Sequence, residues 1–213
     1  MSRWRLTTRW IWAMALGAFF GRLLSVYPGG LFFQWPFVLV ARALGRTLEG
    51  PAAIPVRLAA LSLALGLAVS VWQVLALGSR VRHPWAWALG LPWVWAWGTA
   101  LLAAGLLSRV PEPRRWLTSP WGLAAALLWG LMVGTSQAWL LPLPSRAWPR
   151  WLLLNALGGA WFWLYGLVRL AFQPGLDLPA LLAPIIWAML TGPFLEAQAP
   201  PASPTSSQPA AEG

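Results

Sequence analysis

Residues 66–98 read GLAVSVWQVLALGSRVRHPWAWALGLPWVWAWG, and residues 130–162 echo this stretch without a gap. The two copies stand 64 residues apart and share ten of 33 positions. Leu and Ala identities carry little weight in so apolar a chain. The informative identities pair Gln73 with Gln137, Arg82 with Arg146, Trp87 with Trp151, and Trp97 with Trp161. They predict an internal duplication of a helix pair, with units at about residues 56–110 and 120–174.

The composition is typical of a membrane protein. Of the 213 residues, 59% are hydrophobic and 9% are charged, whereas a soluble domain carries about 25% charged residues. Several apolar runs exceed the roughly 18 residues that mark a spanning helix. We therefore predict an all-α fold, a polytopic transmembrane helical bundle over residues 1–197. Two spans separate equivalent positions of the echo, so the duplicated units should run parallel. Residues 198–213 are rich in Pro, Ser and Ala and predict a disordered tail.

Seven apolar segments are candidate spans. They cover residues 10–27, 31–44, 56–77, 85–107, 120–141, 151–172 and 178–195. The second is short, roughly 21 Å as a helix, and contains Pro36, so a re-entrant or interfacial segment is the alternative. Seven spans would place ten loop Arg residues inside and four outside, whereas six would divide them seven and seven. This bias favours seven spans in a bacterial inner membrane, with the N-terminus cytoplasmic and the C-terminus outside.

Several classes of chemistry are excluded. The chain has no Cys, which removes thiolate catalysis and thiolate–metal sites. It has one His, which argues against haem ligation by paired histidines. The five carboxylates are scattered, with no pair spaced for metal binding or acid–base work. We therefore expect no enzyme, no cofactor and no metal. The basic residues are all Arg in short loops, where they set topology and meet lipid head groups rather than nucleic acid.

The nineteen tryptophans divide by their depth in the predicted spans. Many lie near span ends, where indoles form an aromatic belt at the head groups, including Trp10, Trp85, Trp87, Trp116, Trp121, Trp148 and Trp151. Trp97 and Trp161 lie deeper, near the midplane. Helix packing and lipid contact explain deep indoles, and the alternative is an aromatic-lined cavity for an apolar or cationic ligand.

A sparse polar set completes the candidate ligand site. Arg22 lies inside a long span, where a charge marks a functional site unless it snorkels to the head groups. Gln73 and Gln137 lie near span ends and need hydrogen bonds, which another helix, the head groups or a ligand could supply. Asn155 adds a further amide. The ligand-binding candidates are Arg22, Gln73, Trp97, Gln137, Asn155 and Trp161.

Two Gly-x-x-x-Gly pairs predict close helix packing. They are Gly17 with Gly21, and Gly130 with Gly134. This spacing puts the small residues on one helix face and lets another backbone approach. The partner helix could belong to the same chain or to another membrane protein, so both remain open beside the lipid bilayer itself.

The repeated pattern Gly-x-x-Val-x-x-x-Gln-x-x-x-Leu-x-x-x-x-Arg-x-x-x-x-Trp resembles uncharacterised bacterial polytopic membrane proteins, in which a Gly-rich helix and a Gln, Arg and Trp motif recur. The resemblance implies a fold and no activity. We expect a non-catalytic integral membrane protein, an accessory or scaffold protein that binds lipid or an apolar ligand. The alternative is a transporter, or its substrate-capture component, for a small molecule. In that case the polar candidates should line one water-accessible cavity.

Overall fold

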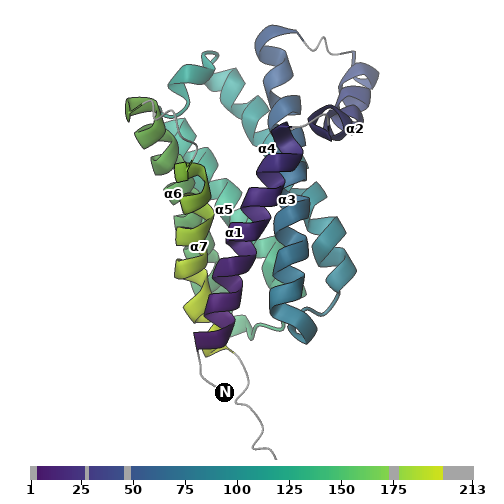
Figure 1. Ribbon diagram of the computed structural model, residues 1–213. Helices are drawn as coiled ribbons and strands as arrows, with labels where there is room; N and C mark the ends of the chain where they lie inside the picture. Colours follow the sequence, from purple (N-terminus) through teal and green to yellow (C-terminus); the bar gives the residue numbers. More distant parts are fainter. Residues whose placement is uncertain (1–3, 27–28, 46–48, 173–177, 199–213) are drawn as a thin grey trace, which may run out of the picture.

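A computed structural model describes residues 4–26, 29–45, 49–172 and 178–198 (Figure 1). The described residues form helices and no strand, which confirms the all-α prediction. The α-helices are α1 (Trp4–Val26), α2 (Gly29–Ala43), α3 (Ile54–Leu77), α4 (Leu91–Arg109), α5 (Pro120–Leu140), α6 (Trp148–Phe172) and α7 (Leu178–Ala197). These bounds lie close to the seven apolar segments. The predicted tail, residues 198–213, lies outside the described part of the chain apart from Gln198.

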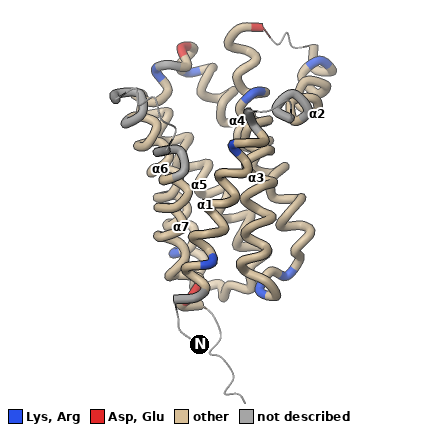
Figure 2. The backbone as a smooth tube through the Cα atoms, in the orientation of Figure 1, with Lys and Arg blue, Asp and Glu red and all other residues tan. Residues whose placement is uncertain are grey.

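Three helical stretches are long and apolar enough to cross a membrane. They are Gly50–Arg80, Ala86–Arg109 and Pro120–Leu140, and the described part of α7 adds a shorter apolar helix, Leu182–Ala197. Most charged residues of the described chain lie toward the two ends of the bundle (Figure 2). This separation of apolar middle and charged ends fits a helix bundle that spans a bilayer.

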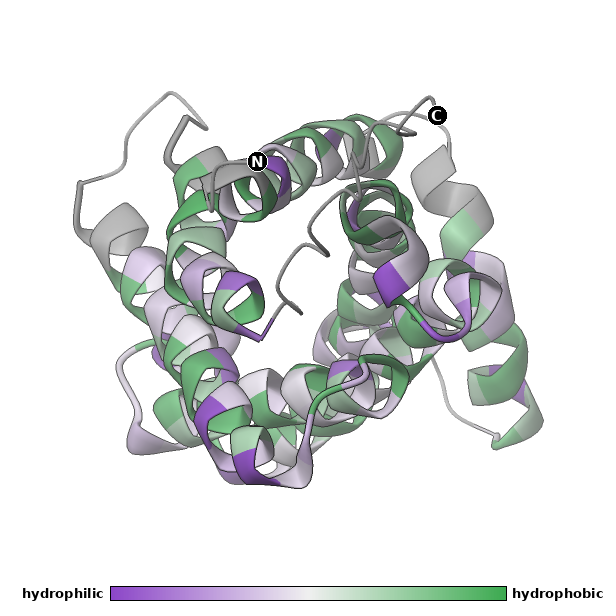
Figure 3. Ribbon diagram, turned by 90° about the horizontal axis from the view of Figure 1, so that it is seen from below, coloured by the Kyte–Doolittle hydropathy of each residue, from purple (hydrophilic) through white to green (hydrophobic). Residues whose placement is uncertain are grey.

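Six helices pack side by side in a closed ring. Helix α1 contacts α3, which is followed around the ring by α4, α5, α6 and α7, and α7 returns to α1. The ring is seen along its axis in Figure 3. Helix α2 lies outside it and packs on α3, where Phe37 joins a cluster with Ala59, Ala60, Leu63 and Ala96. The first and last ring helices are therefore neighbours, although they are at opposite ends of the sequence.

Neighbouring helices α1 and α3 are antiparallel. A Cβ added at Gly17 would lie 2.6 Å from Val69 Cα, and one at Gly21 would lie 2.8 Å from Leu65 Cα. Residue numbers thus rise along α1 as they fall along α3. The preference for seven spans requires these helices to be parallel, because a crossing α2 would return the chain to its starting side. In the structure α2 instead lies at one end of the bundle (Figure 1).

A π-helical segment, Ala86–Gly90, precedes α4 and was not predicted. Pro92 stands at the beginning of α4 and has no N–H to offer the preceding turn, and its ring would clash with the carbonyl of Ala88. A wider turn relieves both problems, which is a common origin of a π-helical bulge. The segment carries Trp87, whose side chain is wholly buried.

Candidate functional site

Three tryptophans, each near the beginning of a ring helix, are the largest fully buried side chains among the described residues. Trp10, Trp87 and Trp151 expose 2%, 0% and 0% of their surface. The prediction that they belong to the aromatic belt is wrong, because their indoles face other helices and not the head groups. Each indole N–H, a donor that needs a partner when buried, bonds to the helix that precedes it around the ring.

Trp87 is joined to α3 by a hydrogen bond to a side chain. We call such a bond from a buried indole to another helix a clamp. Its Nε1 donates to Gln73 Oε1 at 3.0 Å, and Gln73 Nε2 donates to Met14 Sδ at 3.1 Å. Gln73 is itself buried, so both ends of its amide are used between helices. The clamp connects α1, α3 and the π-helical segment, and it is an interhelical bond of the kind that a buried Gln in a membrane requires.

Trp151 is held by a main-chain clamp to α5. Its Nε1 donates to the carbonyl O of Gly134 at 3.0 Å. One turn later, Asn155 Nδ2 donates to Trp151 O at 2.9 Å, and a Cβ at Gly134 would lie 2.8 Å from Asn155 Cβ. The missing side chain at Gly134 therefore lets α6 approach α5 closely. Gln137 is also buried, on the same helix as Gly134.

Trp10 is held by a third clamp, to α7. Its Nε1 donates to Thr191 Oγ1 at 2.9 Å. One turn before Trp10, the main-chain N–H of Thr7 donates to Glu196 Oε2 at 3.2 Å, and the Thr7 hydroxyl donates to the same oxygen. A carboxylate at the beginning of α1 is favourable, since the first turn of a helix has unpaired N–H groups and a positive dipole end. These bonds join the two ends of the chain and close the ring.

Hydroxyl groups connect the middle of the ring. Thr99 Oγ1 accepts from Trp129 Nε1 at 3.1 Å, lies 3.1 Å from Ser62 Oγ and lies 2.8 Å from Trp95 O. Trp95 Nε1 in turn donates to Ser136 Oγ at 3.0 Å. The contacts run across α3, α4 and α5. The sequence carried no signal for this network, because isolated Ser and Thr residues in apolar helices do not reveal which helix they face.

The deep tryptophans Trp97 and Trp161 have different surroundings. Trp97 exposes 37% of its surface and packs on Phe37 of α2, with ring centroids 4.8 Å apart. Trp161 is half-buried on α6, and its Nε1 is buried without a hydrogen-bond partner among the described residues. The same is true of Trp163 Nε1, Tyr165 Oη and Asn155 Oδ1, so α6 carries four such polar atoms.

Three of the six candidate ligand residues have contacts that place them in separate helix interfaces. Gln73 lies between α3 and its neighbours, Asn155 between α5 and α6, and Trp97 beneath α2. Arg22 follows Gly21, which packs on α3. Glu196 is bound by Thr7, which lies about 22 Å from Arg22 along α1. These contacts do not gather the candidates around one cavity.

Both small-residue faces meet helices of the same chain. Gly17 and Gly21 pack on α3 as described above, and a Cβ at Gly130 would lie 2.2 Å from Asn155 O of α6. Both glycine faces therefore lie against helices of the same chain.

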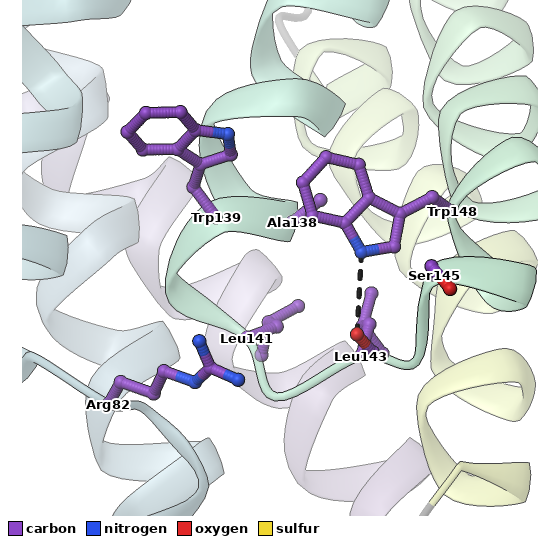
Figure 4. A pocket seen from close by; sticks show the side chains of 7 residues that line it. All are labelled: Arg82, Ala138, Trp139, Leu141, Leu143, Ser145 and Trp148. Carbon is purple, nitrogen blue, oxygen red and sulfur yellow. Dashed lines mark hydrogen bonds between the residues drawn. The ribbon is translucent and has the colours of Figure 1, made fainter.

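A depression of about 420 Å³ opens where the α3–α4 connection meets the end of α5 (Figure 4). Arg82 reaches it from one side, and Ser145 and Trp148 from the other, with Trp139 at its edge. The main-chain N–H of Arg82 donates to Leu140 O at 3.1 Å, which anchors this connection to α5. The sequence marked Arg82 as an identity of the echo but did not indicate that Arg82 would line a depression.

The residues that the structure describes contain no group of three His, Asp or Glu side chains that could hold a metal ion. Comparison of the chain with protein-family models, curated proteins and solved structures gives no match. The arrangement of helices and clamps is therefore the basis for assigning a function.

Proposed function

We propose that this chain is a non-catalytic integral membrane protein whose clamped helix ring serves as a scaffold or accessory component. The single observation that carries the proposal is the clamp of Trp87, Gln73 and Met14. Gln73 is buried, and both ends of its amide are hydrogen-bonded to other helical segments. The indoles of Trp10 and Trp151 also donate to other helices, so these three buried tryptophans hold helices together.

A scaffold of this kind presents its outer face to lipid or to other membrane helices. Trp12, Trp35 and Leu101 are among the large apolar side chains that are more than half exposed. We expect purification in mild detergent, followed by mass spectrometry of the intact assembly, to find a stoichiometric protein partner, a second copy or tightly bound lipid. A bare monomer without any of these would contradict the proposal.

The membrane topology that we propose has six spans, with α2 at one surface and both chain ends on the cytoplasmic side. The antiparallel α1 and α3 support it, as does the contact between Thr7 and Glu196. Because the chain has no Cys, single-Cys variants can be labelled cleanly. Ser2→Cys and Ser79→Cys should react with an impermeant reagent from the cytoplasmic side, and Ser108→Cys from the other. Labelling of Ser2→Cys and Ser79→Cys from opposite sides would contradict six spans and support the seven-span topology.

We also propose that α3–α4 and α5–α6 arose by duplication of one helix pair. Equivalent glycines meet equivalent neighbours: Gly66 packs on Pro92, Gly130 packs on Ala156, and these neighbours are also 64 residues apart. Trp87 and Trp151 support the duplication as well, since both donate to the preceding helix of their own pair.

A transporter, or a substrate-capture component, is the alternative function. The four buried polar atoms of α6 that have no partner among the described residues favour it, because such donors and acceptors suit a polar ligand or water. An Asn155→Cys variant separates the two proposals. A transporter predicts reaction of this cysteine with a water-soluble thiol reagent in the native protein, whereas a packed scaffold predicts reaction only after unfolding. Ser145→Cys, at an exposed loop position, should react in both cases.

A further inference from the structure

We propose that the depression beside Arg82 binds the phosphodiester head group of an anionic phospholipid. The inference rests on the proposed function only in requiring that the chain lies in a bilayer. It concerns a different place from the clamps, at the end of the ring where α3 and α5 end and α6 begins.

Charge is the first argument. The lining contains the guanidinium of Arg82 and no acidic side chain. In the sequence, no Asp or Glu lies between Glu49 and Glu112, or between Glu112 and Asp177, so neither connection that forms the depression supplies a counter-charge. Arg80 and Arg146 belong to the same two connections, and Arg150 lies in the first turn of α6. An anion is the ligand that this charge distribution attracts.

The polar groups of the lining converge from two sides. Figure 4 shows the Arg82 guanidinium directed toward the α5–α6 connection, with Ser145 and the indole of Trp148 across the depression. Trp148 Nε1 donates to Leu143 O at 3.4 Å, which is a long and weak bond, so this N–H is available to a stronger acceptor. A guanidinium, a hydroxyl and an indole N–H are suitable donors to phosphate oxygens.

The apolar part of the lining and its position identify a lipid as the source of the phosphate. Ala138, Leu141 and Leu143 surround the polar groups, and Trp139 is 74% exposed at the edge. The site lies at a helix end, where an apolar bundle meets the head-group layer and indoles prefer to lie. A volume of about 420 Å³ falls in the range of small-ligand pockets and accommodates a head group.

Among the described residues, Arg82 is anchored through its main chain, and its guanidinium forms no hydrogen bond or ion pair. Its N–H bonds Leu140 O, so an Arg82→Gln substitution removes the charge and keeps the anchor. Arg146 is the matched control, because it occupies the equivalent position of the echo, is exposed, and does not line the depression. General attraction between a basic loop and an anionic membrane would affect both variants alike.

The test is a titration of detergent-solubilised protein with phosphatidylglycerol, phosphatidylcholine or inorganic phosphate, followed by mass spectrometry of the intact complexes. We expect Arg82→Gln to weaken phosphatidylglycerol binding about fivefold, since a basic side chain near an anionic head group contributes on this scale. Ser145→Ala should weaken it about threefold through one lost hydrogen bond. Arg146→Gln should stay within about twofold of the wild type.

Three results would overturn the inference. Equal losses in Arg82→Gln and Arg146→Gln would indicate unspecific charge attraction. Equal binding of phosphatidylcholine would indicate an apolar groove, and displacement of the lipid by inorganic phosphate would indicate a site for free anions. The lipid-site proposal and the scaffold proposal can fail independently. A monomer without partners that still binds phosphatidylglycerol through Arg82 would contradict only the scaffold. A stoichiometric assembly in which Arg82→Gln and Arg146→Gln bind the lipid equally would contradict only the lipid site.

Discussion

The two echoing helix pairs place the same tryptophan in the same buried position and satisfy it differently. Trp87 donates to the side chain of Gln73, whereas Trp151 donates to the main chain of Gly134. The residue equivalent to Gly134 in the first pair is Ser70, which has a side chain at the helix face. At Gly134 the bare backbone lets α6 approach, and the carbonyl comes within reach. The Gly-to-Ser difference between the pairs therefore accompanies a different acceptor for the buried indole.

The largest expected effect breaks the close approach in one pair and spares the other. Gly130→Ala should destabilise the protein by about 3 kcal/mol, since its Cβ would meet main-chain atoms. That Cβ would lie 2.2 Å from Asn155 O, whereas a Cβ at Gly66 would come no nearer than 3.2 Å to any neighbour. Gly66→Ala should therefore cost less than about 1 kcal/mol. The measurement is the free energy of unfolding in one detergent.

Gly90→Ala is the control for this comparison, because no atom lies within 4 Å of the added Cβ. Replacing Gly by Ala increases helix propensity by about 1 kcal/mol at both Gly66 and Gly130, so this contribution cancels when the two variants are compared. Equal losses at Gly66 and Gly130 would show that the pairs do not differ in packing.

The second effect separates the two clamps. Trp87→Phe leaves the buried Oε1 of Gln73 without its donor and should cost about 2 kcal/mol. Trp151→Phe should cost about 1 kcal/mol, because the Gly134 carbonyl lies within α5 and retains its helical hydrogen bond. Chemical unfolding of both variants gives the difference. Adding Gln73→Leu to Trp87→Phe should recover part of the loss, and a double variant less stable than Trp87→Phe would refute the clamp.

A smaller effect concerns Thr99, which connects the first pair to Trp129 of the second. Thr99→Val keeps the shape of the side chain and removes the hydroxyl, so it should destabilise by about 1 kcal/mol, the scale of an interhelical hydrogen bond in a membrane. Thr99→Ser retains the hydroxyl and should lose less. The thermal unfolding midpoints of the two variants test this. Identical midpoints would show that the Thr99 hydroxyl does not stabilise the protein.

The smallest expected effect is a gain in stability. Ser70 is fully buried, and its Oγ has no hydrogen-bond partner among the described residues. Ser70→Ala removes an unpaired buried hydroxyl and adds a better helix former, so the free energy of unfolding should rise by about 0.5–1 kcal/mol. A loss of stability would show that the hydroxyl is bonded in the membrane, by water or by a main-chain carbonyl.

The sequence predicted the site only where a polar or small residue in an apolar helix requires a particular kind of neighbour. A Gln in an apolar span must find a partner, so the interhelical bond of Gln73 could be expected, as could the close packing of Gly130 and Gly134. The inward orientation of Trp87 could not, because depth along a span does not tell which face of the helix a side chain occupies. The hydroxyl network of Thr99 depended entirely on neighbours from other helices.

The sequence by itself predicted the all-α fold, the approximate positions of the helices and the glycine faces, because each depends on residues close together in the chain. Apolar length predicts a helix in a membrane, and Pro, Gly and Arg mark its ends. Only the tertiary structure decided that α2 lies at one end, that α1 and α3 are antiparallel, and that Thr7 meets Glu196. Helices that are apolar on all sides carry no pattern that selects a neighbour. Their directions follow from packing and hydrogen bonds between segments as distant as the two ends of the chain.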